Sequence, residues 1–246
     1  MSSSSINRVT IATTKGEVLS AMSLGKSGLH GKRPFILVIH GWTSSMSRYP
    51  ERLAPAIYKG YSCVMFDMRG HGETGYELSN YSRKDHFDDC LAAYDYMVKL
   101  PNIDLENISV FGSSYGGYMA TLLSAERKVH NLILKAPAQY PDEGWDEPKL
   151  SQERDQVSLY RQQPHTIEDN KALKAINIYQ GKLLFIECEK DEQVPKQVMV
   201  DYRKYISVPY DYELLEGSDH ACKLPGTNEM FVERMGKWFT KQYEAK

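Results

Sequence analysis

The stretch Ile108-Ser-Val-Phe-Gly-Ser-Ser-Tyr-Gly-Gly-Tyr-Met-Ala120 decides the fold, because it changes from strand to helix across one tight turn. Residues 108–111 form an apolar run of strand length, and an apolar segment of helical length follows at 115–125. The turn between them has the form Gly-x-Ser-x-Gly and is centred on Ser114. A Cβ on either flanking glycine would clash in so sharp a reversal, so the serine is held strained with its hydroxyl exposed. The pattern predicts Ser114 as a nucleophile and Ser113, one residue out of register, as structural.

Strands and helices alternate on both sides of this turn. Continuous apolar runs such as Phe35–Ile39 are typical of strands that are covered on both faces. The alternation therefore predicts the α/β class, with a mostly parallel twisted sheet and helices on both of its faces. The expected strands are 9–13, 17–24, 35–39, 61–66, 108–111, 132–134, 183–187 and 210–215, and the expected helices are 49–58, 83–100, 115–125, 168–179, 195–206 and 229–243.

Three local signals complete this interpretation of the chain. Thr166-Ile-Glu-Asp169 resembles a capping box and predicts the start of the helix at 168–179. Gly25–Lys32 is rich in glycine and lysine and is expected to form a loop, and the Ser2–Ser5 tail is expected to be disordered.

Composition excludes several classes of protein. The 246 residues include 30 Lys and Arg against 32 Asp and Glu, a formal net charge of −2, which gives no electrostatic reason to bind nucleic acid or an acidic membrane. The length suits a single domain spanning residues 1–246. The longest apolar runs, 35–39 and 183–186, are far shorter than the roughly 18 residues that a membrane span requires. No signal peptide is expected at the N-terminus.

The cysteines point to a reducing compartment. Cys63, Cys90, Cys188 and Cys222 form no CxxC motif and no zinc-ligand spacing, so no metal site is expected. Four free thiols in the cytoplasm are the simplest interpretation. Cys188 and Cys222 each lie near a predicted catalytic residue, so a disulfide between them is the alternative.

A serine hydroxyl needs a base that takes its proton, and the chain offers seven histidines. His220 lies in a loop after the expected strand at 210–215 and before the last helix. Ligands of open α/β sheets bind at the carboxyl ends of the strands, which is where this loop lies. His40 and His71 also follow strands, but each belongs to a glycine motif. Placement and chain order therefore select His220.

The imidazole in turn needs a carboxylate that fixes its tautomer and stabilises its charged form. Asp191 follows the expected strand at 183–187 by a short turn, and it completes the chain order Ser114, Asp191, His220. Glu187 and Glu189 are reserve candidates for the same role.

Two other aspartates are weaker candidates for the acid. Asp219 is adjacent to His220, and the side chains of neighbouring residues diverge. Asp67 also follows a strand, but Arg69 is two residues away and predicts a structural ion pair.

These residues, with three further motifs, resemble the α/β-hydrolase family over essentially the whole chain from Val9 onward. His40-Gly41-Trp42 looks like the oxyanion loop of the family, Asp67–Thr74 like its D-x-R-G-x-G-x-[ST] turn, and Asp191–Pro195 like its D-x-x-V-P acid turn. The resemblance implies a serine hydrolase that requires no cofactor. It also implies an oxyanion hole made by the backbone N–H groups of Trp42 and Tyr115. The physics agrees, because Tyr115 opens a helix whose free N–H groups favour a negative oxygen.

Within this family the signals diverge. Ser114-Tyr-Gly-Gly117 is similar to prolyl-oligopeptidase-type hydrolases, but their oxyanion loop usually carries His-Gly-Gly, and Trp42 stands at the third place here. The His-Gly-Trp loop and Gly70-His71-Gly72 look more like cinnamoyl/feruloyl-type carboxylesterases and monoacylglycerol lipases. Dehalogenases are excluded, because their nucleophile is an aspartate.

One segment interrupts the alternation of strands and helices. Residues 138–165 are too many for an ordinary connection between elements. In the carboxylesterase and lipase relatives a lid occupies this place, so the resemblance predicts a lid here, with Tyr140 and Trp145 as substrate contacts. The alternative is a surface excursion packed by its own aromatic side chains.

The sequence therefore predicts a serine hydrolase that acts on a small-molecule carboxylic ester. Ser114 attacks the acyl carbon, His220 takes and returns the proton, and Asp191 orients His220. A thioesterase or a small acyl-peptidase would use the same residues, and a non-catalytic ligand receptor on a hydrolase fold would belong to another class. The aromatic residues of the insertion suggest an apolar or aromatic group on the substrate.

Overall fold

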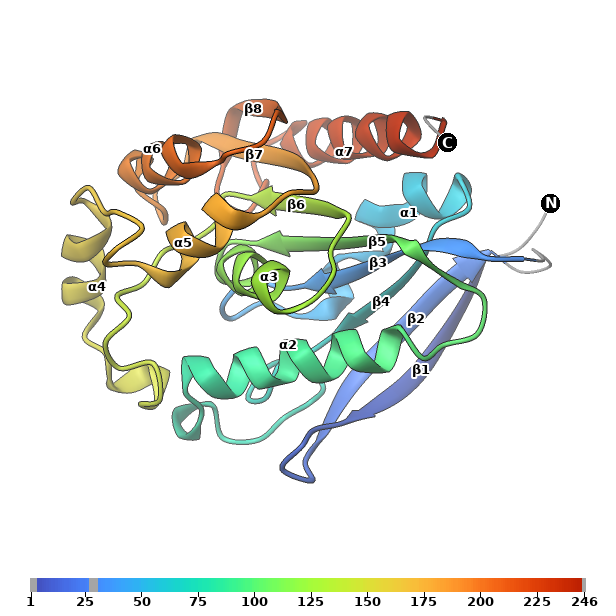
Figure 1. Cartoon of the computed structure of the whole chain (residues 1–246), viewed down its shortest axis with the longest axis horizontal. Coiled ribbons are helices and arrows are strands. Elements are labelled where there is room, and N and C mark those ends of the chain that lie inside the picture. Colours follow the sequence, from blue (N-terminus) through green and yellow to red (C-terminus); the bar gives the residue numbers. More distant parts are fainter. Residues whose placement is uncertain (1–3, 27–30, 245–246) are drawn as a thin grey trace.

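A single mixed sheet runs through the molecule (Figure 1). The computed structural model describes residues 4–26 and 31–244. The eight strands lie in the order β1-β2-β4-β3-β5-β6-β7-β8, where β1 and β2 are antiparallel to their neighbours and all other pairs are parallel. The strands are β1 (Ser4–Ala12), β2 (Val18–Lys26), β3 (Arg33–Ile39), β4 (Ser62–Phe66), β5 (Ile103–Ser113), β6 (Asn131–Lys135), β7 (Lys182–Lys190) and β8 (Tyr210–Asp219). The predicted mostly parallel sheet is confirmed.

Helices cover both faces of this sheet. Helices α1 and α7 pack on one face, and α2, α3, α5 and α6 pack on the other (Figure 1). The helices are α1 (Pro50–Tyr58), α2 (Arg83–Met97), α3 (Tyr115–Glu126), α4 (Arg154–Arg161), α5 (Lys171–Ile178), α6 (Lys196–Tyr205) and α7 (Thr227–Glu244), with short 3-10 turns η1 (Met46–Arg48), η2 (Leu78–Asn80) and η3 (Lys149–Ser151).

Strand β3 shows why its sequence is apolar throughout. Leu37 and Ile39 belong to the core beneath α2 and α3, whereas Ile36 and Val38 belong to the core beneath α1 and α7. Successive side chains of a strand point to opposite faces, so a strand covered on both faces needs an apolar residue at every position.

Three local expectations differ from the structure. Strand β1 begins at Ser4, inside the tail that was expected to be disordered, and Ser2 and Ser3 lie outside the described residues. Strand β2 extends to Lys26, and the remainder of the expected loop at 27–30 lies outside the described residues.

The third difference is the start of α5. Its N-cap is Asn170, whose side-chain oxygen accepts hydrogen bonds of 3.0 Å from the N–H groups of Ala172 and Leu173. Asp169 instead accepts a hydrogen bond from the Thr166 N–H, at 2.8 Å, and closes a turn before the helix. The expected capping box is therefore wrong by one turn, because two side chains capable of capping compete within five residues.

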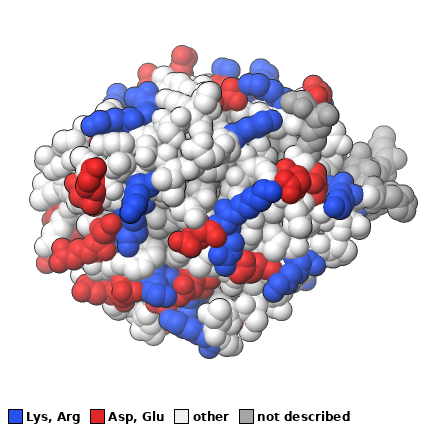
Figure 2. Space-filling view, in the orientation of Figure 1, with Lys and Arg blue, Asp and Glu red and all other residues white. Residues whose placement is uncertain are grey.

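The carboxyl ends of the parallel strands meet at one edge of the sheet, and the segment containing η3 and α4 lies beyond that edge (Figure 1). On the face shown in Figure 2, basic and acidic side chains lie next to one another across the surface. Among residues 4–26 and 31–244, no helix combines the length and the apolar character needed to cross a membrane.

Candidate active site

The turn between β5 and α3 has the strained geometry that its sequence predicts. Ser114 has φ 56° and ψ −118°, a conformation that is costly for a residue with a side chain. A Cβ on Gly112 would overlap the carbonyl of Gly116, and a Cβ on Gly116 would overlap the carbonyls of Ile39 and His40. The turn therefore requires glycine at both flanking positions. The amide of Ser114 donates to the Lys135 carbonyl at 2.9 Å, which ties the turn to β6.

Asp191 and His220 meet at the carboxyl ends of the neighbouring strands β7 and β8. Asp191 Oδ2 lies 2.6 Å from His220 Nδ1, and both side chains are largely buried. The other carboxylate oxygen of Asp191 accepts hydrogen bonds from the N–H groups of Gln193 and Val194, at 2.9 and 2.8 Å. These bonds hold the carboxylate in place, so the Asp–His pair is oriented before any substrate binds.

The reserve candidates for the acid lie elsewhere. Glu187 pairs with Arg203 at 3.2 Å, and Glu189 accepts a hydrogen bond of 2.7 Å from the Gly217 N–H. Asp219 accepts hydrogen bonds from the N–H groups of Lys223 and Leu224, which cap the loop after His220. Each of these carboxylates has its own structural role, and Asp191 alone among them contacts the imidazole.

Ser114 and His220 line one cavity of about 280 Å³ at this edge of the sheet. Within the described residues, the Ser114 hydroxyl makes no hydrogen bond to His220, and such contacts are often loose before a substrate binds. The lining residues are Gly41, Trp42, Thr43, Ser44, Arg48, Tyr49, Arg52, Ser113, Ser114, Lys135, Tyr140, Arg161, Gln193, Val194, His220, Ala221 and Lys223.

The loop after β3 lies directly beside the serine. A Cβ built on Gly41 would stand 3.4 Å from the Ser114 Cβ, and Trp42 follows as a lining residue of the cavity. The Trp42 N–H donates to no acceptor in the part of the chain that the structure describes. Tyr115 is the first residue of α3, where N–H groups have no intrahelical acceptor. Both predicted oxyanion donors are thus placed next to Ser114 with available N–H groups.

His40 and His71 are buried, and burial lowers the pKa of each to about 4. His40 Nε2 accepts a hydrogen bond of 3.1 Å from the Met68 N–H, and His71 Nδ1 lies 3.1 Å from the Arg69 carbonyl. Both imidazoles are therefore neutral, and their hydrogen bonds hold the loops around the site.

The structural role predicted for Asp67 holds, but its partner was wrong. The Asp67 carboxylate accepts hydrogen bonds from the N–H groups of Met46 and Glu73, at 2.6 and 2.8 Å, and so fastens two loops. Arg69 points elsewhere and pairs with Asp89 at 2.7 Å. Side chains two residues apart in a strand project to the same side, but Asp67 and Arg69 lie in a turn, where their side chains diverge.

The insertion brings only one of its two predicted contact residues to this cavity. Tyr140 is buried and lines the cavity beside Ser114. Trp145 lines a separate cavity of about 520 Å³, where its ring lies 5.8 Å from that of Phe87 and 4.2 Å from the Lys171 ammonium. The prediction that Trp145 contacts substrate is therefore corrected: its ring packs against α2 and α5.

Sequence reasoning missed the basic residues of the site. Arg48, Arg52, Arg161 and Lys223 line the cavity, and none of them belongs to a recognisable motif. The fully buried Lys135, the last residue of β6, donates a hydrogen bond of 2.6 Å to the His220 carbonyl. A lysine at the end of an otherwise apolar strand was the one available signal.

The cysteines near the site are thiols. All four cysteines are free and buried, as expected. A hydrogen-bond interaction with Cys222, together with burial, raises the pKa of the Cys188 thiol, so the two predicted neighbours do lie close together.

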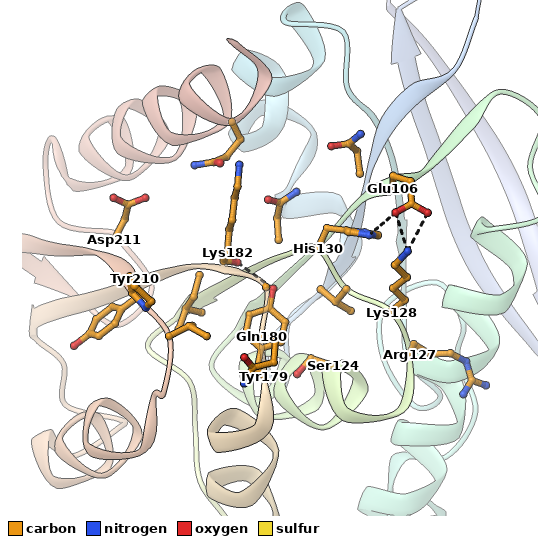
Figure 3. Close-up of a pocket in the computed structure, with 18 of the residues that line it drawn as sticks. Glu106, Ser124, Arg127, Lys128, His130, Tyr179, Gln180, Lys182, Tyr210 and Asp211 are labelled. Atoms are coloured by element: carbon orange, nitrogen blue, oxygen red, sulfur yellow. Dashed lines mark hydrogen bonds and ion pairs between the residues drawn. The ribbon is translucent and has the colours of Figure 1, made fainter. Parts of the chain in front are cut away.

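A second hollow must be distinguished from this site. A cavity of about 1020 Å³ lies at the amino ends of β6, β7 and β8, the opposite ends of the same strands (Figure 3). Two ion pairs lie among its lining residues, Glu106 with Lys128 (Figure 3) and Asp211 with Lys241. A choice of the active site by cavity volume would select this hollow. The strained Ser114 and the Asp191–His220 pair lie instead at the carboxyl ends of the strands.

The chain has the α/β-hydrolase fold. Est1E of Butyrivibrio proteoclasticus, solved with ferulic acid, superposes with a TM-score of 0.74 at 20% identity, covering 97% of this chain and 100% of that one. Residues 48–246 match the model of the prolyl oligopeptidase family, and the chain belongs to that family. The match starts after the His40-Gly41-Trp42 loop, which is where the sequence departs from the usual His-Gly-Gly.

Curated relatives match a shorter part of the chain. An uncharacterized peptidase of Bacillus subtilis, YuxL, is 32% identical over 117 residues, which cover 44% of this chain and 18% of that protein. Acylamino-acid-releasing enzyme 1 of Oryza sativa subsp. japonica is 33% identical over 98 residues, which cover 37% of this chain and 12% of that protein. The chain thus matches less than a fifth of the length of either relative.

Proposed function

We propose that this protein hydrolyses carboxylic esters through an acyl-enzyme intermediate. His220 takes the proton of the Ser114 hydroxyl, whose oxygen bonds to the acyl carbon and expels the alcohol, which leaves with that proton. Water then attacks the acyl-enzyme by the same route and releases the acid. The observation that carries the proposal is the strained Ser114 in one cavity with His220, which Asp191 holds at 2.6 Å.

The oxyanion of each tetrahedral intermediate would be held by the N–H groups of Trp42 and Tyr115. This assignment is supported by two observations: both residues lie beside Ser114, and among the described residues their N–H groups donate to no other acceptor. Preorganised N–H donors of this kind stabilise the transition state more than the substrate, since the negative charge develops only on the way to the intermediate.

The charges of the cavity favour an ester over a peptide with a free amino terminus. No aspartate or glutamate is among its described lining residues, whereas arginine and lysine are. An α-ammonium group would meet like charges there and no carboxylate. An acyl-peptidase is the second candidate, because a blocked amino terminus carries no charge and a rice acylamino-acid-releasing enzyme is among the relatives.

Residues 138–165 would act as a lid over this cavity. Tyr140 and Arg161 from this segment line the cavity, and the Lys149 ammonium lies 3.7 Å from the centre of the Trp42 ring. An isolated antiparallel bridge between Ser82 and Pro148 fastens the segment to the start of α2. The four free thiols support the expected cytoplasmic location.

Matched substrates test the proposal. We expect N-acetylphenylalanine methyl ester to be hydrolysed and the corresponding p-nitroanilide to be cleaved far more slowly, with Ser114→Ala as the control that removes both activities. A higher kcat/KM on the anilide would make the protein an acyl-peptidase. An absence of turnover on esters, thioesters and anilides by folded protein would favour a ligand receptor.

A further inference from the structure

The wall that residues 138–165 contribute to the cavity is basic. Arg161, the last residue of α4, lines the cavity with its guanidinium carbon 4.4 Å from the centre of the Tyr140 ring. The Lys149 ammonium lies 5.0 Å from the same ring and 3.7 Å from that of Trp42. Two cations from separate turns of the insertion therefore converge on the two aromatic rings that border Ser114.

These cations have no acidic partners. In the described part of the chain, no carboxylate oxygen lies within 4 Å of a side-chain nitrogen of Arg161 or Lys149, and the same is true of the rim residues Arg48, Arg52 and Lys223. Arg161 donates from Nε to the Gln139 carbonyl at 2.8 Å, and its side chain also makes a hydrogen-bond interaction with the Tyr140 hydroxyl. Its terminal nitrogens donate to no carboxylate among the described residues, so the charge of the guanidinium can be shared with a carboxylate of a bound molecule.

The neighbouring Arg83 is also satisfied by neutral groups. It donates to the carbonyls of Pro141 and Glu143. A carbonyl accepts the hydrogen bond of a cation but, being neutral, does not compensate its charge. Partly buried cations without counter-ions are costly, so such a cluster is evidence of a ligand that supplies the negative charge.

The pKa shifts agree with a positive field at this wall. Burial lowers the pKa of the Lys149 ammonium, the Tyr140 hydroxyl raises it and Arg161 lowers it, and the net pKa is lowered. Burial raises the pKa of the Tyr140 hydroxyl, but Arg161 and Lys149 outweigh that effect and the net pKa is lowered. A field that eases ionisation of a buried phenol would also stabilise a carboxylate at the same place.

We propose that the substrate is an ester that carries a free carboxylate, which Arg161 and Lys149 bind while Ser114 attacks the ester carbonyl. This inference rests on the ester hydrolysis proposed above. The positive field would also raise the local concentration of such a substrate, because the cavity is small and its basic rim faces solvent.

Isosteric substrates test it. Monoethyl adipate and ethyl adipamate differ only in carboxylate against amide and place the group on the acyl part, and 4-acetoxybenzoate and 4-acetoxybenzamide place it on the alcohol part. We expect kcat/KM for the acid to exceed that for its amide by at least about tenfold in one of the two pairs. The pair that shows the preference locates the carboxylate. Equal values in both pairs would overturn the proposal.

Variants assign the preference to the two cations. Arg161→Gln and Lys149→Met should each lower the acid-to-amide ratio toward one, and 0.5 M KCl should lower the ratio of the wild type. Lys204→Met removes the same charge from an exposed position of α6, outside the cavity, and should keep the wild-type ratio. A ratio that survives in both Arg161→Gln and Lys149→Met, or that falls equally in Lys204→Met, would contradict the assignment.

A binding measurement separates this inference from the proposed function. If the wild type hydrolyses none of these esters, adipate and adipamide are compared as protectants of Ser114 against a fluorophosphonate probe. Protection by adipate alone, lost in Arg161→Gln, would support the carboxylate site while the ester reaction fails. Equal protection, or none from either compound, would overturn the carboxylate site itself.

Discussion

The two ends of the parallel strands carry cavities that differ in charge pairing. At the amino ends, the cavity of about 1020 Å³ holds the ion pair of Glu106 with Lys128, at 2.8 Å (Figure 3). It also holds the ion pair of Asp211 with Lys241, at 2.8 Å. At the carboxyl ends, the cavity of about 280 Å³ holds Arg161 and other cations without a carboxylate among its described lining residues.

The difference teaches how to recognise the working end of the sheet. Paired charges at a surface hollow contribute little stability and need no ligand to explain them. Unpaired cations and a strained serine backbone each destabilise the fold. Their occurrence in one cavity therefore indicates a functional site. The size of a hollow carries no such information, since the larger of these two has both acidic and basic lining residues and no strained serine.

The largest effect expected from this comparison is the loss of the nucleophile. Ser114→Ala should lower kcat by several orders of magnitude and leave the fold intact, because the members of such a triad act as a unit. Ser124→Ala, at the rim of the amino-end cavity, should leave kcat unchanged. Turnover and fluorophosphonate labelling of both purified variants measure this.

Ser113→Ala checks the register of the turn. It should retain labelling, because Ser113 ends β5 one residue before the strained position. Labelling that is lost in Ser113→Ala and kept in Ser114→Ala would show that the nucleophile is misassigned.

A second pair of variants exchanges one carboxylate at each end for an amide. Asp191→Asn should lower kcat by up to about 10⁴, because the amide favours the wrong tautomer of His220. Asp211→Asn weakens contacts with Trp238 and Lys241 and should change kcat by less than about twofold, with a free energy of unfolding lower by about 1 kcal/mol or less. Steady-state kinetics and urea denaturation measure the two quantities. A similar loss of kcat in both variants would mean that the comparison of the two ends is wrong.

The smallest kinetic effect is expected for Trp145. Since its ring packs on Phe87 and Lys171 away from Ser114, Trp145→Ala should lower the free energy of unfolding by about 2–4 kcal/mol. KM for a bulky ester should stay within about twofold of the wild type, because the substitution removes no contact with the substrate. Tyr140→Phe is the matched variant, because Tyr140 lines the cavity beside Ser114, and its KM for the same ester should change. A large rise of KM confined to Trp145→Ala would restore it as a substrate contact.

Much of the site could be predicted from short-range sequence patterns. Gly112, Ser114 and Gly116 are constrained by contacts within one turn, so their meaning is local and survives without a structure. The alternation of apolar runs determined the order of strands and helices, and through it the edge at which Asp191 and His220 meet.

Choices between neighbouring candidates needed the structure. Asn170 and Thr166 are both good caps, and only the packing of α5 decides where that helix begins. Asp191, Glu187 and Glu189 all follow the same strand, and the direction in which each side chain points separates them.

The sequence by itself therefore determined the fold class, the strained turn at Ser114 and the order of the three predicted catalytic residues, because each rests on steric or periodic constraints within a few residues. Only the tertiary structure decided which charges remain unpaired. Arg52 comes from α1, Arg161 from α4 and Lys223 from the loop before α7, and nothing near any of them in the chain shows that they share one cavity rim without a carboxylate. Charge compensation is a property of the space around a group, and that space is filled by residues far apart in the chain.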